Sequence, residues 1–132
     1  IKTKFILSMP KTSPRDKTPN PPEYLAPVAD YFKVLSEISR LQILGCLRER
    51  AMNVSEIGEA TGLGQANLSK HLKMLTEAEI LSRQPQGVAV YYKIKEPMIF
   101  ELCELVCDRL YQRMQQKAEQ FKQLNAFSAS SK

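Results

Sequence analysis

The sequence predicts a mainly α-helical domain that carries one small β-hairpin. Two observations predict this class: four apolar patterns with helical spacing precede a single pair of strand-like segments, and one long helical pattern follows that pair. A length of 132 residues suits one domain with a modest core. No stretch approaches the ~18 apolar residues of a membrane span.

Both ends of the chain are predicted to lie outside this domain. Residues 1–22 form a proline-rich basic segment, which we interpret as a flexible arm. Two interpretations of the arm stay open, a contact with DNA and a leader without function. The domain itself is expected over residues 23–125, and residues 126–132 are expected to form a disordered tail.

Two helices are predicted to open the domain. The first runs from Tyr24 to about Leu35, and its apolar residues recur at helical spacing: Leu25, Val28, Phe32 and Leu35. The second lies in EISRLQILGCLRER, and its predicted buried stripe is Ile38, Leu41, Leu44 and Leu47. Each of these two helices therefore presents one apolar face.

Two further helices follow with only a tight turn between them. Asn53 can cap the first of them, and Glu56 three residues later completes a capping box. Gly62 supplies the left-handed residue that ends this short helix. The next run, GQANLSKHLKMLTEAEIL, places three leucines on its inward face: Leu68, Leu72 and Leu75. Two short helices joined in this way indicate a helix-turn-helix.

A hairpin and a long helix complete the domain. The strands are expected at Ile80–Arg83 and Val88–Ile94, on either side of a turn at residues 84–87. Pro97 occupies the favoured first position of the last helix, which continues without glycine or a further proline to about Leu124. This element order, α-α-α-α-β-β-α, describes a winged helix-turn-helix.

The sequence resembles the ArsR/SmtB family of bacterial transcriptional regulators, the arsenic-repressor type. The resemblance covers roughly Tyr24 to Tyr111, and three tracts carry it: LSEISRLQILGCL (35–47), NVSEIGEATGLGQANLSKHLKMLTEAEIL (53–81) and GVAVYYKI (87–94). It implies a homodimer through the first and last helices that binds a palindromic operator in double-stranded DNA. It also implies that residues 64–81 enter the major groove while the hairpin wing follows the DNA backbone.

Eight side chains are candidate DNA contacts: Gln65, Asn67, Ser69, Lys70, His71, Lys73, Arg83 and Gln86. Amide side chains suit adenine, and lysines suit phosphate or guanine. The net charge of +5 also fits an anionic partner. His71 lies toward the apolar edge of its helix, so we favour a partly buried, hydrogen-bonded histidine over a base contact.

Two features depart from the family pattern. The wing offers Arg83, Gln84 and Gln86 where relatives often carry several arginines, so its phosphate contacts should be weaker and less dependent on salt. Glu79 stands where relatives usually place glycine, after the recognition helix. We therefore expect a different backbone conformation at that corner.

Three cysteines bear on regulation: Cys46, Cys103 and Cys107. Neither of the family's usual metal-ligand patterns is present, and three hypotheses stay open: packing as small hydrophobic residues, sensing of an oxidant or reactive sulfur, and binding of a soft metal or metalloid. Cys103 and Cys107 share an apolar stripe with Phe100, Leu110, Met114 and Phe121. A helix resists a disulfide between residues one turn apart, so Cys46 would pair more easily with either, if the helices are adjacent.

The leading hypothesis is a sequence-specific repressor that a thiol-directed signal releases from its operator. The alternatives are a repressor that responds to a soft metal through its cysteines and a winged-helix module that binds protein and not DNA. An enzyme is disfavoured, since the chain has one histidine, no glycine-rich phosphate loop and no nucleophile with a plausible base. We expect no catalytic residue and no cofactor. Without an export signal in IKTKFILS, a cytoplasmic protein with reduced thiols is expected.

Overall fold

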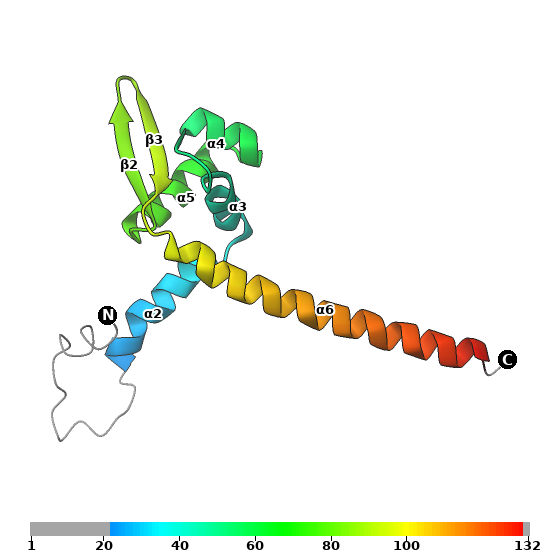
Figure 1. Ribbon diagram of the computed structural model, residues 1–132. Coiled ribbons are helices and arrows are strands. Elements are labelled where there is room, and N and C mark those ends of the chain that lie inside the picture. The colour runs from blue at the N-terminus through cyan, green and yellow to red at the C-terminus, as the bar shows by residue number, and fades with distance from the viewer. Residues whose placement is uncertain (1–21, 131–132) are drawn as a thin grey trace, which may run out of the picture. The chain divides into compact units, whose positions relative to one another are not determined.

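The computed structural model describes residues 22–130. Of the arm predicted at residues 1–22, all but Pro22 lies outside the described part, as do the last two residues of the chain. Along the chain follow α2 (Pro22–Leu35), α3 (Ile38–Cys46), β1 (Met52–Asn53), α4 (Val54–Thr61), α5 (Gln65–Glu77), β2 (Leu81–Gln86), β3 (Ala89–Ile94) and α6 (Met98–Ser130) (Figure 1). This order confirms the predicted fold class. Within residues 22–130, no helix combines the length and the apolar character that crossing a membrane requires.

The chain divides into two compact units, one ending at Glu37 and the other beginning at Ile38. The first unit contains α2, of which no residue is buried. Three residues of its predicted apolar stripe are exposed: Leu25, Val28 and Phe32. A helix of 14 residues is marginal by itself in water, so this apolar face needs a packing partner.

The core of the second unit joins α3, α4, α5, the start of β2 and the first turn of α6. Its buried hydrophobic residues are Ile43, Leu44, Leu47, Ile57, Leu68, Leu72, Leu75, Ile80, Leu81 and Ile99. The three leucines predicted for the inward face of α5 are all among them, which confirms the orientation of that helix.

The buried face of α3 differs from the predicted one. Ile38 and Leu41 are 77% and 43% exposed, whereas Arg40 and Ile43 are 7% and 0% exposed. The buried set also follows helical spacing, at positions 40, 43, 44 and 47. Leu44 and Leu47 are buried as predicted, and the prediction was wrong for Ile38 and Leu41. An arginine in the buried set hides the pattern from hydropathy.

The sheet has three antiparallel strands in the order β1-β3-β2. Sequence reasoning missed β1, a two-residue strand whose Asn53 pairs with Tyr91. The hairpin is longer than predicted and turns at Gly87, which has a φ of 62°, and not over residues 84–87. Pro85 therefore lies inside β2, where it is tolerated because β2 is an edge strand.

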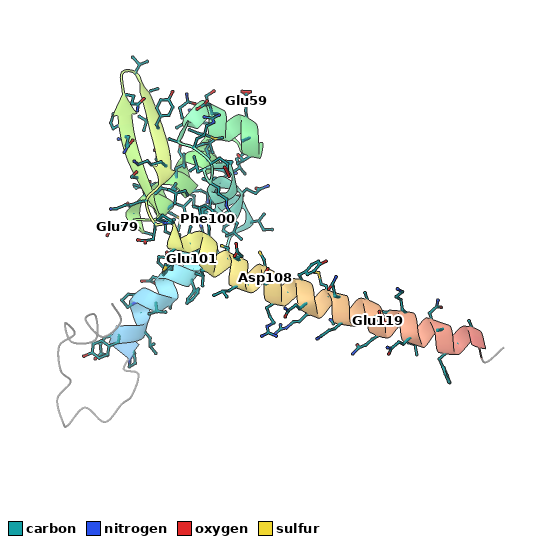
Figure 2. The ribbon with its side chains drawn as sticks, viewed as in Figure 1. Glu59, Glu79, Phe100, Glu101, Asp108 and Glu119 are labelled. Carbon is teal, nitrogen blue, oxygen red and sulfur yellow. The ribbon has the colours of Figure 1, made fainter. Side chains whose placement is uncertain are left out.

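The last helix is longer than its apolar pattern predicted. It begins at Met98, directly after Pro97, and ends at Ser130 and not near Leu124. The segment predicted as a disordered tail is thus helical to Ser130. Its 33 residues span about 50 Å at 1.5 Å per residue. All residues from 104 to 129 are exposed, and side chains such as Asp108 and Glu119 project from several sides of the helix (Figure 2).

Candidate nucleic-acid interface

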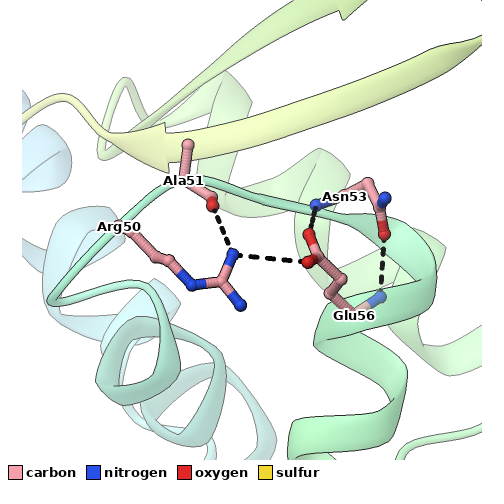
Figure 3. A network of polar contacts seen from close by, with 4 residues as sticks. All are labelled: Arg50, Ala51, Asn53 and Glu56. Atoms are coloured by element: carbon pink, nitrogen blue, oxygen red, sulfur yellow. Dashed lines mark hydrogen bonds and ion pairs between the residues drawn. The ribbon is translucent and has the colours of Figure 1, made fainter.

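The helix-turn-helix begins with the predicted capping box (Figure 3). Asn53 Oδ1 accepts from the Glu56 backbone N–H at 2.8 Å, and Glu56 Oε1 accepts from the Asn53 N–H at 2.9 Å. Arg50 Nη1 donates to Glu56 Oε2 at 3.3 Å and to the Ala51 carbonyl at 3.1 Å. The Asn53 N–H, with a smaller contribution from Arg50, holds the pKa of Glu56 below its ordinary value. Because Asn53 also pairs with Tyr91, the cap connects α4 to the sheet.

A short turn then sets α5 against α4. Gly62 adopts a φ of 74° and donates its N–H to the Gly58 carbonyl at 2.8 Å, as the sequence predicted for the end of α4. Only three residues, Gly62, Leu63 and Gly64, separate the two helices. A Cβ at Gly58 would lie 3.6 Å from Leu68 Cδ2, which shows how closely α4 and α5 approach.

The outer side of α5 presents a polar, basic surface. Five of the predicted DNA contacts are exposed there: Gln65, Asn67, Ser69, Lys70 and Lys73. No acidic residue occurs on α5 before Glu77 at its last position. The buried leucines lie on the opposite side of α5, so its polar side is exposed and has the dimensions to fit the major groove of DNA.

A groove of about 190 Å³ lies between α5 and the wing. Its lining residues are Val54, Ser69, Leu72, Lys73, Thr76, Glu77, Arg83 and Tyr92. It brings together three predicted contacts from two elements, Ser69 and Lys73 of α5 and Arg83 of β2. Gln86 is exposed at the end of β2, opposite Ala89, and does not line this groove.

Sequence reasoning missed Tyr92 as a neighbour of this groove. Tyr92 is the cross-strand partner of Arg83, so both side chains emerge on the same face of the hairpin. The alternating pattern of residues 89–94 indicates a strand, but only the register of the hairpin shows that Tyr92 lies opposite Arg83. Because the turn was expected at residues 84–87, that register was not available.

His71 lies in the interior and not on the exposed surface. It is 8% exposed, and Arg40 Nη1 lies 3.1 Å from its Nδ1. This placement agrees with the interpretation of a buried, hydrogen-bonded histidine and separates His71 from the other candidate contacts. Its partner, Arg40 of α3, was not singled out in the sequence.

The corner after α5 keeps the left-handed conformation that glycine usually supplies, so the expected change of conformation was wrong. Glu79 has a φ of 61°. Its N–H donates to the Thr76 carbonyl and that of Ile80 to the Leu75 carbonyl, both at 3.0 Å, which is a Schellman motif. Figure 2 shows Glu79 at this corner, where Lys95 Nζ lies 2.9 Å from its Oε1. That contact holds the pKa of Glu79 below its ordinary value.

The three cysteines are unpaired and differ in exposure. Cys46 is half-buried and donates to the Ile43 carbonyl at 3.2 Å, Cys103 is half-buried, and Cys107 is exposed. Burial raises the pKa of Cys46 and of Cys103, and the neighbouring Cys107 contributes to the second shift. Within residues 22–130, no three Cys, His, Asp or Glu side chains are grouped to hold a metal ion.

The fold and this surface define a winged helix-turn-helix protein, and comparison with known sequences gives its family. The profile described as the arsR family of bacterial regulatory proteins matches residues 39–83. KmtR of Mycobacterium tuberculosis, an HTH-type transcriptional regulator, is 27% identical over 84 residues, which cover 64% of this chain and 65% of KmtR. The aligned part thus spans less than two thirds of KmtR. The transcriptional repressor PagR of Bacillus anthracis is 30% identical over 79 residues, covering 59% of this chain and 79% of PagR.

Solved structures agree with the sequence relatives. Rv0081 of M. tuberculosis superposes with a TM-score of 0.66 at 31% identity, covering 74% of this chain and 98% of Rv0081. The homodimeric winged helix-turn-helix DNA-binding domain of Mb0332 from Mycobacterium bovis gives 0.64 at 26% identity, with 75% and 94% covered. Reduced HlyU from Vibrio cholerae gives 0.57 at 27% identity, with 67% and 93% covered.

This chain belongs to the arsR family of bacterial regulatory proteins. The family was correctly predicted from the sequence. The relatives named above as regulators and repressors form a non-enzymatic class, in agreement with the prediction that this chain is not an enzyme.

Proposed function

We propose that this protein is a homodimeric transcriptional repressor that binds a palindromic operator in double-stranded DNA. The observation that carries the proposal is the exposed polar surface of α5, whose Ser69 and Lys73 share a groove with Arg83 of the wing. Gln65 and Asn67, in the first turn of α5, suit base edges, because the N-terminal residues of a recognition helix reach furthest into the major groove. Lysines and Arg83 suit phosphates.

The apolar surface of α6 supports a dimer. Seven residues of α6 are spaced alternately by four and three residues: Cys103, Cys107, Leu110, Met114, Lys117, Phe121 and Leu124. This is the heptad spacing with which helices pack against each other. Leu110, Met114, Phe121 and Leu124 are all exposed in the single chain, as is the apolar face of α2. A second copy of this chain would cover both faces, and the homodimeric state of the Mb0332 domain supports this arrangement.

The test is selection of duplexes from a random pool, followed by fluorescence anisotropy titrations of the selected and a scrambled duplex at several salt concentrations. We expect the selected duplex to bind at least about 10³-fold more tightly. Replacing Lys70 by alanine removes one phosphate contact per subunit. The slope of log K against log salt should therefore become shallower by about 1.8 for the dimer.

Lys122→Ala is the matched control, because it removes the same charge from an exposed position on α6, away from the heptad positions. It should leave the slope unchanged. Equal slopes for the two variants would show that α5 is not the DNA-binding surface. If no duplex is enriched and all DNA binds equally weakly, the protein is an interaction module for another protein and the proposal fails.

We propose that a thiol-directed signal, an oxidant or reactive sulfur, releases the operator. Support comes from the heptad position of Cys107 on α6, where a change at its sulfur would alter how the two α6 helices of the proposed dimer pack. Burial raises the pKa of Cys46 and Cys103, so these two carry less of the reactive thiolate at neutral pH. In the proposed step, peroxide converts the Cys107 thiol to a sulfenic acid and releases water, and a second thiol then closes a disulfide and releases a second water. Altered packing of paired α6 helices changes the spacing of the two α5 helices.

Intact mass and operator affinity, measured on the reduced and the peroxide-treated protein, test this signal. Peroxide should weaken operator binding of the wild type and not of Cys107→Ser, whereas Cys46→Ser should still form the sulfenic acid. Binding that is insensitive to peroxide in the wild type would contradict the proposal. A parallel titration with Cd²⁺ tests the soft-metal alternative, for which thiolates from both subunits would have to combine.

A further inference from the structure

Arg40 is a charged side chain in the core of the second unit. It belongs to α3, is 7% exposed, and its Nη1 lies 3.1 Å from His71 Nδ1 and 3.2 Å from Met74 Sδ. His71 and Met74 are on α5, three residues apart and therefore on one side of that helix. A buried guanidinium is rare, because removing it from water is unfavourable unless polar partners replace the water.

The chemistry of this contact defines the state of His71. Arginine is always protonated and can only donate, so Nδ1 of His71 must accept. The imidazole is therefore neutral, with its proton on Nε2. A protonated His71 would place a second cation against the guanidinium in the interior, where like charges repel strongly.

The two acceptors alternate along α5 with residues of its DNA-facing surface. His71 directly follows Lys70, and Met74 directly follows Lys73. One guanidinium that holds two positions on successive turns fixes both the rotation of α5 about its axis and its position along that axis relative to α3. A rotation of ~10° would move side-chain tips about 5 Å from the axis by roughly 1 Å. Such a shift exceeds what a bidentate contact to a base tolerates.

We infer that Arg40 is a positioning residue for DNA recognition: through His71 and Met74 it sets the orientation of α5, and with it operator selectivity, without contacting DNA. This inference rests on the proposed function. The predicted signature is a loss of affinity for the operator with little change for a scrambled duplex. Contacts to phosphates tolerate a small rotation of α5, whereas contacts to base edges do not.

The test compares Arg40→Met, which keeps an unbranched side chain but removes all donors, with wild type and Arg40→Lys. For Arg40→Met we expect about a tenfold smaller ratio of operator to scrambled affinity, the size of one mismatched base pair. Arg40→Lys should recover part of the ratio because its ammonium group can still donate a hydrogen bond. Arg48→Met is the matched control: it removes the same charge from an exposed residue whose guanidinium lies 4.9 Å from the Phe100 ring, and it should keep the ratio.

The single histidine of the chain gives an independent readout. Nitrogen NMR of histidine-labelled protein should show one neutral tautomer in the wild type, with hydrogen on Nε2, and a mixture in Arg40→Met. If Arg40→Met does not fold, Met74→Leu removes one acceptor at similar volume and should give a smaller loss of the ratio. An unchanged ratio in the folded variants, or a proton on Nδ1 in the wild type, overturns the inference. A wild type that does not distinguish the two duplexes refutes the proposed function instead, and the NMR result still decides the Arg40–His71 contact.

Discussion

Replacing Asn53 by alanine should destabilise the protein through the loss of one capping hydrogen bond. The Asn53 side chain satisfies the Glu56 N–H at the start of α4, while its backbone pairs with Tyr91 of β3. Alanine removes only the first of these contacts, since strand pairing uses main-chain atoms. Loss of an asparagine cap reduces stability by about 1 kcal/mol, within a range of roughly 0.5–2.

For a chain of 132 residues, a loss of about 1 kcal/mol corresponds to a fall in Tm of roughly 4 °C. Thermal unfolding followed by circular dichroism measures it. All variants have to be compared at one protein concentration, because the Tm of a dimer depends on concentration. Asn53→Ser is the matched variant, because serine caps about as well as asparagine.

Serine should therefore keep most of the Tm that alanine loses. If serine and alanine lower the Tm equally, the loss does not come from the cap acceptor and the reasoning is refuted. An alanine variant as stable as the wild type would show that the capping box does not form in solution.

Three further predictions concern the same unit. Glu79→Gly should have a higher Tm than Glu79→Ala, because both variants lose the contact with Lys95 but only glycine adopts a φ of 61° without strain. A higher Tm for the alanine variant would exclude the left-handed backbone conformation at this corner. Leu75→Ala should lower the free energy of unfolding in urea by about 2–5 kcal/mol, against less than about 0.5 for Leu105→Ala, since the two leucines are 0% and 71% exposed. Because the pKa of Glu56 is lowered, its ionised form stabilises the fold above about pH 4.3, and this contribution is lost as pH falls through the lowered pKa. Glu56→Gln lacks this carboxylate, so its Tm should fall less than that of the wild type between about pH 5 and 3. An unchanged pH profile in that variant would contradict the assigned cap.

Errors in the sequence predictions arose where a residue's role depends on segments far along the chain. The buried face of α3 was predicted only in part, because Arg40 is buried where it contacts α5 and hydropathy assigns every arginine to solvent. The strand β1 has two residues and no pattern of its own, and only its pairing with β3 defines it. The turn of the hairpin was displaced because Pro85 was taken as a turn residue, although an edge strand accepts proline.

The sequence by itself determined the order of the helices and of the two hairpin strands, the capping box at Asn53, the left-handed end of α4 at Gly62 and the leucine face of α5. These features depend on spacing and on backbone preferences within a few residues, and such information is local. The tertiary structure alone decided that Ser69, Lys73 and Arg83 line one groove, that His71 faces Arg40 and that Glu79 keeps a conformation suited to glycine. Each of these depends on contacts or on backbone geometry that only the packed chain defines, and neither composition nor periodicity contains that information.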